Sequence, residues 1–245
     1  MARLLILGGT GEAAALACRV AADRPGLEVI TSLAGRTGSR PAVPGRVRVG
    51  GFGGAAGLAA FLRAEAVDAV IDATHPFAVR ISAHAAAACA ETSVPRLALV
   101  RPSWRLRDGD LWIMADTAGA AAARLPDLGR RAFLTVGIGE LAAFADRPGV
   151  HYLVRLIASG PVPLPECDVV PGRGPFRVED EIALMRRHAI DVLVTKESGG
   201  DATYAKIAAA RALSLPVLMI RRPPPPAGTA VGDAEAAVAW LDRVL

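Results

Sequence analysis

The sequence predicts an α/β protein of two successive domains, each with a mainly parallel sheet covered by helices on both faces. Short apolar runs alternate with alanine-rich segments of helical period along most of the 245 residues, as in repeated strand-and-helix units. The alternation breaks over residues 101–131, where prolines and glycines interrupt it. A second alternating series follows, so two sheets are expected rather than one.

The first half contains apolar runs short enough for single strands, separated by segments long enough for helices. The order of these elements is typical of a parallel sheet, because each strand is followed by a helix that can return the chain. Strands are expected at residues 3–7, 27–31, 46–49, 68–72 and 96–100, and helices at 11–22, 54–65 and 78–91.

The second half repeats this pattern, and we place the two domains at residues 1–115 and 116–245. A strand exchanged between the domains would leave no trace in the periodicity, so the periodicity does not fix the boundary. Residues 221–226, Arg-Arg-Pro-Pro-Pro-Pro, must be extended, and we interpret them as a stiff connection to the last helix. Strands are expected at 132–136, 151–154, 167–170, 191–195 and 216–220, and helices at 139–145, 178–188, 203–213 and 233–243.

Composition and charge narrow the class of protein. The 28 basic and 24 acidic residues leave a net charge of +4, and no basic run is present, so nucleic-acid binding has little support. Hydrophobic residues make up 52% of the chain, yet no apolar run approaches the ~18 residues that a membrane span requires. The apolar run 4–7 is too short for a secretory signal. We expect a cytoplasmic monomer that does not associate with membranes.

The cysteines and histidines show no spacing that suggests a metal site. Cys18, Cys89 and Cys167 are odd in number and far apart, which argues against both a disulfide framework and a zinc site. We interpret them as small buried residues. The four histidines are equally scattered, so no metal is expected.

Residues 3–14 join an apolar strand to a helix through a glycine turn. Gly9, Gly11 and Ala14 fit the spacing G-x-G-x-x-A, in which the glycines allow a tight turn and close approach of a pyrophosphate, and the small third residue lets the helix pack on the strand. Amides at the start of the helix would face the phosphates. The alternative is that glycine serves only to reach a positive φ. We expect Rossmann-like domains, with cofactor contacts from Gly8, Gly9, Thr10, Gly11 and Glu12.

The loop after the second strand favours NADP(H) over NAD(H). Adenine dinucleotide sites usually place a carboxylate here to bind the ribose 2′-hydroxyl, but residues 32–40 contain none. Ser32, Arg36 and Thr37 instead supply the hydroxyl and guanidinium donors that a 2′-phosphate needs. The alternative is an ordinary solvated loop in an arginine-rich protein.

A polar cluster follows the fourth strand, where ligands of open α/β sheets bind. Asp72, Thr74 and Pro76 are candidate cofactor contacts, and His75 between them is the candidate catalytic residue. Aspartate, threonine and proline could also serve only to cap the next helix. A histidine adds nothing to capping, which favours the functional interpretation.

Two loops of the second half provide a candidate surface for carboxylates. One loop precedes the helix expected at 178–188, and the other follows the strand expected at 191–195. Cationic side chains, a hydroxyl and glycine amides together suit an acidic ligand, although turn geometry alone could select such residues. The candidate substrate-binding residues are Arg173, Gly174, Pro175, Phe176, Lys196, Ser198, Gly199 and Gly200.

The order of these motifs along essentially the whole chain resembles the precorrin-6A reductase family of cobalamin biosynthesis. The motifs are Gly8-Gly9-Thr10-x-Glu12-Ala13, Ser32-Leu33-Ala34-Gly35-Arg36, Asp72-Ala73-Thr74-His75-Pro76-Phe77-Ala78, Arg173-Gly174-Pro175-Phe176 and Thr195-Lys196-x-Ser198-Gly199-Gly200.

The resemblance implies an NADPH-dependent reduction of a macrocycle double bond, from precorrin-6A to precorrin-6B, on two Rossmann-like domains with an active-site cleft between them. The acidic tetrapyrrole would then bind the loops of the second half, its ring resting on Phe77, Phe176 or Trp104. His75 is the expected proton donor, because its ordinary pKa lies near neutrality.

The sequence is also compatible with other functions. Arg173 resembles the cobalt-independent members of the family, but a cobalt-precorrin-6A reductase of the anaerobic pathway is the alternative. A non-catalytic NADP-binding sensor would share the first half and need no anionic pocket in the second. A nucleotide-sugar transferase would also pair two such halves.

Overall fold

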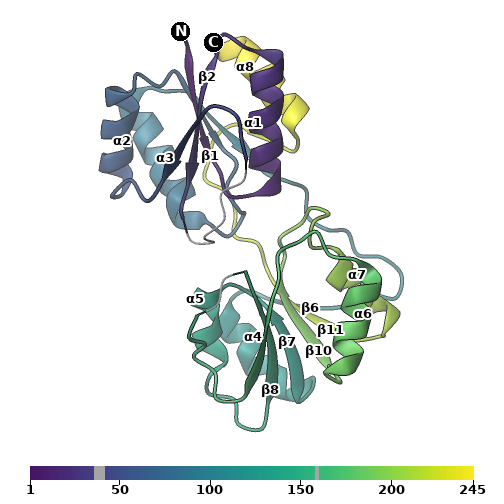
Figure 1. Cartoon of the computed structure of the whole chain (residues 1–245). Coiled ribbons are helices and arrows are strands. Elements are labelled where there is room, and N and C mark those ends of the chain that lie inside the picture. The colour runs from purple at the N-terminus through teal and green to yellow at the C-terminus, as the bar shows by residue number, and fades with distance from the viewer. Residues whose placement is uncertain (36–41, 158–159) are drawn as a thin grey trace. The chain divides into compact units, whose positions relative to one another are not determined.

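The computed structural model describes residues 1–35, 42–157 and 160–245, which form two compact units (Figure 1). Unit one comprises Met1–Pro102 and Pro223–Leu245, and unit two comprises Ser103–Arg222. Each contains one six-stranded sheet in which all paired strands are parallel, so the predicted α/β class is confirmed. In the described part of the chain, the helices are too short or too polar to cross a membrane.

The sheet of unit one has the strand order β12-β5-β4-β1-β2-β3. The central strands have helices on both faces, which explains why residues 4–7 and 69–71 are apolar throughout, whereas the edge strand at residues 46–49 alternates arginine with valine. The elements are β1 (Arg3–Leu7), α1 (Gly11–Asp23), β2 (Glu28–Leu33), β3 (Arg46–Val49), α2 (Ala55–Ala64), β4 (Ala69–Asp72), α3 (Val79–Thr92), β5 (Arg96–Leu99), β12 (Ala230–Val231) and α8 (Ala234–Val244).

Alternate residues of each strand face different helices. On one face, Leu4 and Ile6 pack in a cluster with residues of α1 and α8, including Trp240. On the other face, Leu5 and Leu7 pack with residues of α2 and α3. Figure 1 shows α1 beside α8, and both ends of the chain in unit one. The C-terminal helix therefore completes the core of the unit that contains the N-terminus.

The sheet of unit two has the order β6-β11-β10-β7-β8-β9. The helices α6 and α7 cover one face through a core that includes Phe133, Leu193 and Ile207. The elements are β6 (Leu111–Ala115), α4 (Ala118–Arg124), the 3-10 turn η1 (Leu125–Asp127), β7 (Arg131–Thr135), α5 (Ile138–Leu141), the 3-10 turn η2 (Ala142–Phe144), β8 (His151–Leu156), β9 (Cys167–Pro171), α6 (Val178–Arg187), β10 (Val192–Lys196), α7 (Ala205–Ala212) and β11 (Pro216–Ile220).

The two sheets exchange one edge strand each. β6 follows β5 in the chain but pairs with β11 in unit two, and β12 follows β11 but pairs with β5 in unit one. The units consequently divide before β6 and again after β11, rather than once at residues 115 and 116. The reason is that periodicity reports which residues are buried and carries no information about the strand beside them.

One expectation about the cysteines is wrong. Cys89 on α3 is buried, but Cys18 on α1 is exposed and Cys167 is only partly buried. Cys18 follows the buried Ala17 directly, and one step of about 100° along a helix is enough to turn a side chain from the core to solvent. All three thiols are free.

Replacing Trp240 tests the assignment of α8 to unit one. Trp240 is only 6% exposed, so Trp240→Ala should lower the free energy of unfolding of this unit by about 3–5 kcal/mol. Hydrogen exchange should then become faster in β1 and β4 and stay unchanged in β7 and β10. Leu106→Ala is the control, because Leu106 is 65% exposed. Equal loss of protection in both sheets would contradict the assignment.

Candidate functional site

The parallel sheet of unit one brings three of the predicted cofactor segments together at one edge. Leu7, the last residue of β1, is paired with Ser32 of β2 and with Asp72 of β4. The next residues keep this register, because the amide of Gly8 donates to the Ser32 carbonyl (2.9 Å) and the amide of Ala73 to the Leu7 carbonyl (3.0 Å). The turns that follow β1, β2 and β4 therefore lie side by side, in agreement with the rule that ligands bind at the carboxyl ends of strands.

The glycine turn leaves space above its main chain. Gly9 has a φ of +110°, and a Cβ added at Gly9 or Gly11 would meet no atom within 4 Å. A Cβ at Gly8 would instead lie 3.3 Å from Thr31 Cγ2 and 3.5 Å from the Ala13 Cβ. The close contact between helix and sheet thus involves Gly8 and Ala13, whereas we expected Ala14 in this role. The open side of the turn is what a phosphate approaching the backbone would require.

Thr10 connects the first turn to the turn after β4. Its Oγ1 accepts a hydrogen bond from the amide of Ala13 (3.1 Å) and donates one to the carbonyl of Ala73 (2.8 Å). Thr10 is therefore the N-cap of α1, and α1 starts at a fixed position relative to β4. The first amides of a helix have no intrahelical acceptor, so this end of α1 can bind an anion.

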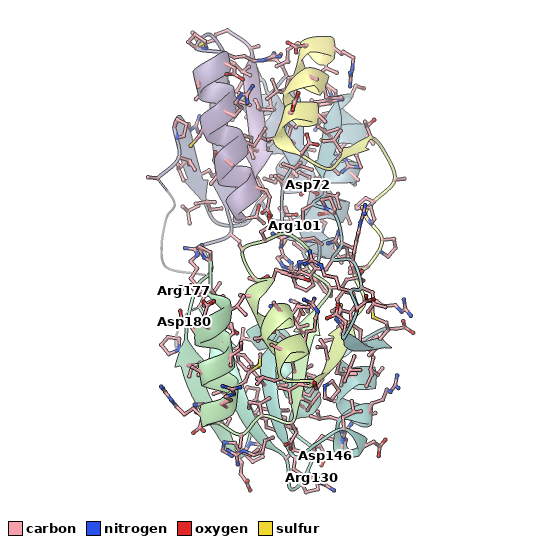
Figure 2. The ribbon with its side chains drawn as sticks, turned by 90° about the vertical axis from the view of Figure 1, so that its right-hand side faces the viewer. Asp72, Arg101, Arg130, Asp146, Arg177 and Asp180 are labelled. Atoms are coloured by element: carbon pink, nitrogen blue, oxygen red, sulfur yellow. The ribbon has the colours of Figure 1, made fainter. Side chains whose placement is uncertain are left out.

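Glu12 is paired with Arg101, a residue that sequence reasoning missed. One guanidinium nitrogen of Arg101, Nη1, lies 2.9 Å from each carboxylate oxygen of Glu12. Burial disfavours the ionised carboxylate, but hydrogen bonds from Arg101 and from the backbone outweigh it and lower the pKa of Glu12. Figure 2 labels Arg101 near Asp72, at the end of unit one where the strands finish. Arg101 directly follows the strand expected at 96–100, and this position could have identified it from the sequence as a residue of the site.

The segment after β4 contains both capping contacts and an oriented imidazole. Asp72 is 5% exposed, and its Oδ1 accepts from the amide (3.2 Å) and hydroxyl (2.7 Å) of Thr74. His75 Nδ1 accepts a hydrogen bond from the amide of Phe77 (3.2 Å). In the neutral ring the hydrogen is therefore on Nε2, which is the nitrogen that could donate to a ligand.

The basic loop proposed for a 2′-phosphate is described only at its start. Ser32 is buried at the end of β2, whereas Arg36 and Thr37 lie outside the described residues. Arg48 of β3 lies opposite Ser32 in the strand register and is a second arginine that sequence reasoning missed. Its guanidinium stacks 3.8 Å from the centre of the Phe52 ring and donates to the carbonyl of Gly51 (2.7 Å), and burial lowers its pKa.

The predicted substrate loops of unit two contact each other. A Cβ added at Gly174, in the β9–α6 loop, would lie 2.4 Å from the carbonyl oxygen of Ala202, in the β10–α7 loop. In Figure 2, Arg177 and Asp180 mark the start of α6, and Arg130 and Asp146 mark the opposite end of the unit. The structure therefore brings these two sets of predicted residues together at one edge of the sheet.

Lys196 is held in an ion pair that the sequence did not reveal. Its Nζ donates to Oε1 of Glu140 on α5 (2.9 Å), and its side chain is 14% exposed. A Cβ at Gly137 would lie 2.7 Å from the other carboxylate oxygen of Glu140. Glycine at this position therefore leaves the space that the carboxylate occupies.

One face of the Phe176 ring packs on an arginine that belongs to an ion pair. The Arg155 guanidinium lies 4.1 Å from the centre of the Phe176 ring and 2.7 Å from Oε1 of Glu181, whose side chain is 1% exposed. Arg173, by contrast, is exposed. The β9–α6 loop is thus anchored by its aromatic side chain and presents its arginine.

The loop after β10 is held by hydrogen bonds to its carbonyls. Ser198 is buried, and Gly199 and Gly200 have φ values of +67° and +71°. Arg222 donates to the carbonyl of Ser198 (2.8 Å), and the indole of Trp104 donates to that of Gly200 (2.6 Å).

Trp104, which we considered as a support for the ring of the ligand, packs on Tyr204 with a centroid distance of 6.1 Å. It also contributes to the core of unit two. Among the residues that the structure describes, no group of three or more histidine, cysteine, aspartate or glutamate side chains could hold a metal ion.

The chain is similar to one family of known proteins over nearly its whole length. Residues 3–242 match the family model described as precorrin-6x reductase CbiJ/CobK. A protein from Rhodococcus erythropolis named precorrin-6A reductase is 53% identical over 98% of both chains. A protein from Priestia megaterium named cobalt-precorrin-6A reductase is 30% identical over 96% of both. A solved structure titled CobK precorrin-6A reductase has a TM-score of 0.92 and 46% identity, covering 99% of this chain and 97% of the other.

The contact between the two loops of unit two can be tested at Gly174. Gly174→Ala should lower the free energy of unfolding of this unit by about 1–3 kcal/mol, because the methyl group would force apart two backbone segments. Denaturant unfolding followed by Tyr and Trp fluorescence would measure it. Gly139→Ala is the control, since a Cβ there meets no atom within 4 Å. Equal stability of the two variants would show that the loops separate without cost.

Proposed function

The chain belongs to the precorrin-6x reductase family, and from this premise we propose that it uses NADPH to reduce precorrin-6A to precorrin-6B. The observation that carries the proposal is 53% identity, over 98% of both chains, to a protein named precorrin-6A reductase. The chain is accordingly an oxidoreductase of cobalamin biosynthesis. The cofactor, the product and the roles of individual residues are the parts that we propose.

The edge of unit one suits a dinucleotide. Open space above Gly9 and Gly11 allows phosphates to approach the backbone, and the helix whose N-cap is Thr10 supplies amides and the positive end of a dipole. When bound, NADPH supplies a hydride. The role of the chain is to fix the cofactor and to exclude water around the reacting carbon atoms.

We assign the remaining cofactor contacts to residues at the same edge. Ser32, with Arg36 and Thr37, would bind the 2′-phosphate through hydroxyl and guanidinium donors. Asp72, Thr74 and Pro76 would form the wall after β4, where two hydrogen bonds from Thr74 hold the Asp72 carboxylate. Gly8 lets α1 pack closely on β1 and β2, and Glu12 keeps the guanidinium of Arg101 beside the start of α1.

The loops of unit two suit a ligand with several carboxylates. Arg173 is exposed and would bind a carboxylate through two parallel hydrogen bonds. Lys196 adds a second cation, and Ser198 with Gly199 and Gly200 adds a hydroxyl and amides. Gly174, Pro175 and Phe176 keep Arg173 in place, because the Phe176 ring is stacked on Arg155.

His75 is the proposed donor of the proton that accompanies the hydride. Its Nδ1 is engaged by the amide of Phe77, so Nε2 would deliver the proton. The ring is partly exposed, as a residue that meets a ligand must be. An imidazole can release a proton near neutral pH, which is the physical basis for this role.

A cobalt-free substrate is favoured over the cobalt-containing one. The relative named precorrin-6A reductase is 53% identical, and the one named cobalt-precorrin-6A reductase is 30% identical. Arg173 in the Arg-Gly-Pro-Phe motif agrees with the same choice. A non-catalytic sensor of NADP would leave the paired cationic loops of unit two without a ligand.

Anaerobic incubation of the purified protein with NADPH and precorrin-6A tests the function directly. We expect loss of NADPH absorbance together with a shift of the macrocycle spectrum, in equal molar amounts. His75→Ala should lower kcat at least about 100-fold if the imidazole donates the proton, and a near-normal kcat would limit this residue to positioning. Absence of NADPH oxidation by the wild type would refute the proposed function, and faster turnover of cobalt-precorrin-6A would reverse the choice of substrate.

The preference for NADPH can be tested at Arg36. Arg36→Ala should raise KM for NADPH by the equivalent of ~1.5–3 kcal/mol, the usual worth of a hydrogen bond to a charged group, and leave KM for NADH nearly unchanged. Steady-state kinetics with both cofactors would measure this difference. Arg19→Ala is a matched control, because Arg19 is an exposed arginine on α1. Similar losses with both cofactors would place Arg36 away from the 2′-phosphate.

A further inference from the structure

The two ends of unit two hold the same loop. Residues 196–201, which we call the β10 loop, start at the last residue of β10 and include four of the proposed substrate-binding residues. The chain enters unit two at Ser103 and leaves it at Arg222. Trp104 lies directly after the entry and Arg222 lies at the exit, and both side chains donate hydrogen bonds to carbonyls of the β10 loop.

Trp104 is fixed on three sides. Its indole nitrogen donates to the carbonyl of Gly200 over 2.6 Å. Its ring packs on that of Tyr204, and the ammonium of the buried Lys206 lies 5.7 Å from the ring centre. The segment between Trp104 and β6 is also held at Asp110. Arg211 donates hydrogen bonds to the carboxylate of Asp110 (2.8 Å) and to the hydroxyl of Tyr204 (2.6 Å). The donor to Gly200 is therefore attached to a rigid part of unit two.

Arg222 binds two neighbouring carbonyls with one side chain. Its Nε donates to the carbonyl of Glu197 (3.1 Å) and its Nη2 to that of Ser198 (2.8 Å). Its own amide donates to Oε2 of Glu197 (3.1 Å). A planar guanidinium can reach both carbonyls at once, and the single ammonium of a lysine cannot do so with the same geometry.

These contacts determine where the amides of the β10 loop point. In a trans peptide the N–H is directed opposite to the C=O. Because the carbonyls of Ser198 and Gly200 point toward Arg222 and Trp104, the amides of Gly199 and Asp201 point away from these side chains. The positive φ values of Gly199 and Gly200 make this arrangement possible. The loop thus turns these two amides away from the side chains that hold its carbonyls.

We propose that Trp104 and Arg222 are positioning residues, which orient the amides of Gly199 and Asp201 to bind a carboxylate of the substrate. The inference rests on the proposed function, because it assigns that carboxylate to the acidic macrocycle. It adds to that function an oriented anion-binding loop, held by the two segments where the chain passes between units.

The protein offers a matched pair of tryptophans for the experiment. Trp104 and Trp112 both pack against the core of unit two, but the buried Nε1 of Trp112 has no hydrogen-bond partner among the residues that the structure describes. Trp104→Phe removes an indole N–H that binds the loop, and Trp112→Phe removes one that does not. Hydrogen exchange of the amides of Gly199 and Asp201 should be faster in Trp104→Phe and unchanged in Trp112→Phe.

Kinetics connect the loop to the reaction. Trp104→Phe should raise KM for precorrin-6A about fivefold, the worth of one net hydrogen bond, with kcat and KM for NADPH within about twofold of the wild type. Arg222→Lys should raise the same KM although the charge is retained. It also serves as the test variant if Trp104→Phe does not fold.

Two results separate this inference from the proposed function. If the wild type does not reduce precorrin-6A, the proposed function fails, and the exchange experiment still decides whether Trp104 orders the loop. If the wild type is active but Trp104→Phe and Trp112→Phe have the same KM for precorrin-6A, or the same exchange of the two amides, the inference is overturned.

Discussion

Parallel strand pairing is the constraint on which the rest of this structure depends. Every strand of a parallel sheet ends at the same edge, so residues far apart in sequence are brought together there without any contact between their side chains. The row of Leu7, Ser32 and Asp72 in unit one illustrates this, because strand register alone aligns the three segments. In unit two the same rule places Lys196 at the edge where the β9–α6 loop begins. The candidate sites are therefore consequences of topology first and of side-chain chemistry second.

The two units carry similar glycine turns with different physical properties. Residues 9–12, Gly-Thr-Gly-Glu, and residues 137–140, Gly-Ile-Gly-Glu, each follow a central strand. In unit one the turn is capped by a threonine and leads into a helix of 13 residues, and the space above Gly9 is open. In unit two isoleucine provides no capping oxygen, the helix has four residues, and the carboxylate of Glu140 fills the space above Gly137. Only the first turn thus has the open backbone and the helix dipole that suit a phosphate.

Sequence reasoning located most of the strands, and it predicted most loops of the candidate sites, because both depend on local patterns. Apolar runs predict buried strands, and the residues that follow them must lie at the edge of a parallel sheet. The two-residue β12 has no period to detect, and β6 lies within a segment that prolines and glycines made irregular. The missed residues of the sites include Arg101, Glu140 and Arg222, ordinary charged residues without special spacing. Their roles arise from partners 89, 56 and 24 residues away, as for Arg101 with Glu12, which only the folded chain defines.

The exchanged strands also explain why the connecting segments are so firmly attached. When an edge strand comes from the other half of the chain, its pairing must offset the entropic cost of closing a long loop. The pairing of β12 can offset little of this cost, because β12 contributes only two residues to its sheet. Its pairing is supplemented by Arg96, which donates to the carbonyl of Ala227, and by α8, which buries Trp240 and Leu241. The segment before β6 is fixed in the same way by the pair of Asp110 and Arg211. Trp104 lies in the segment that leads to β6, so the order that the strand exchange imposes on this segment also supports the hydrogen bond from Trp104 to the β10 loop.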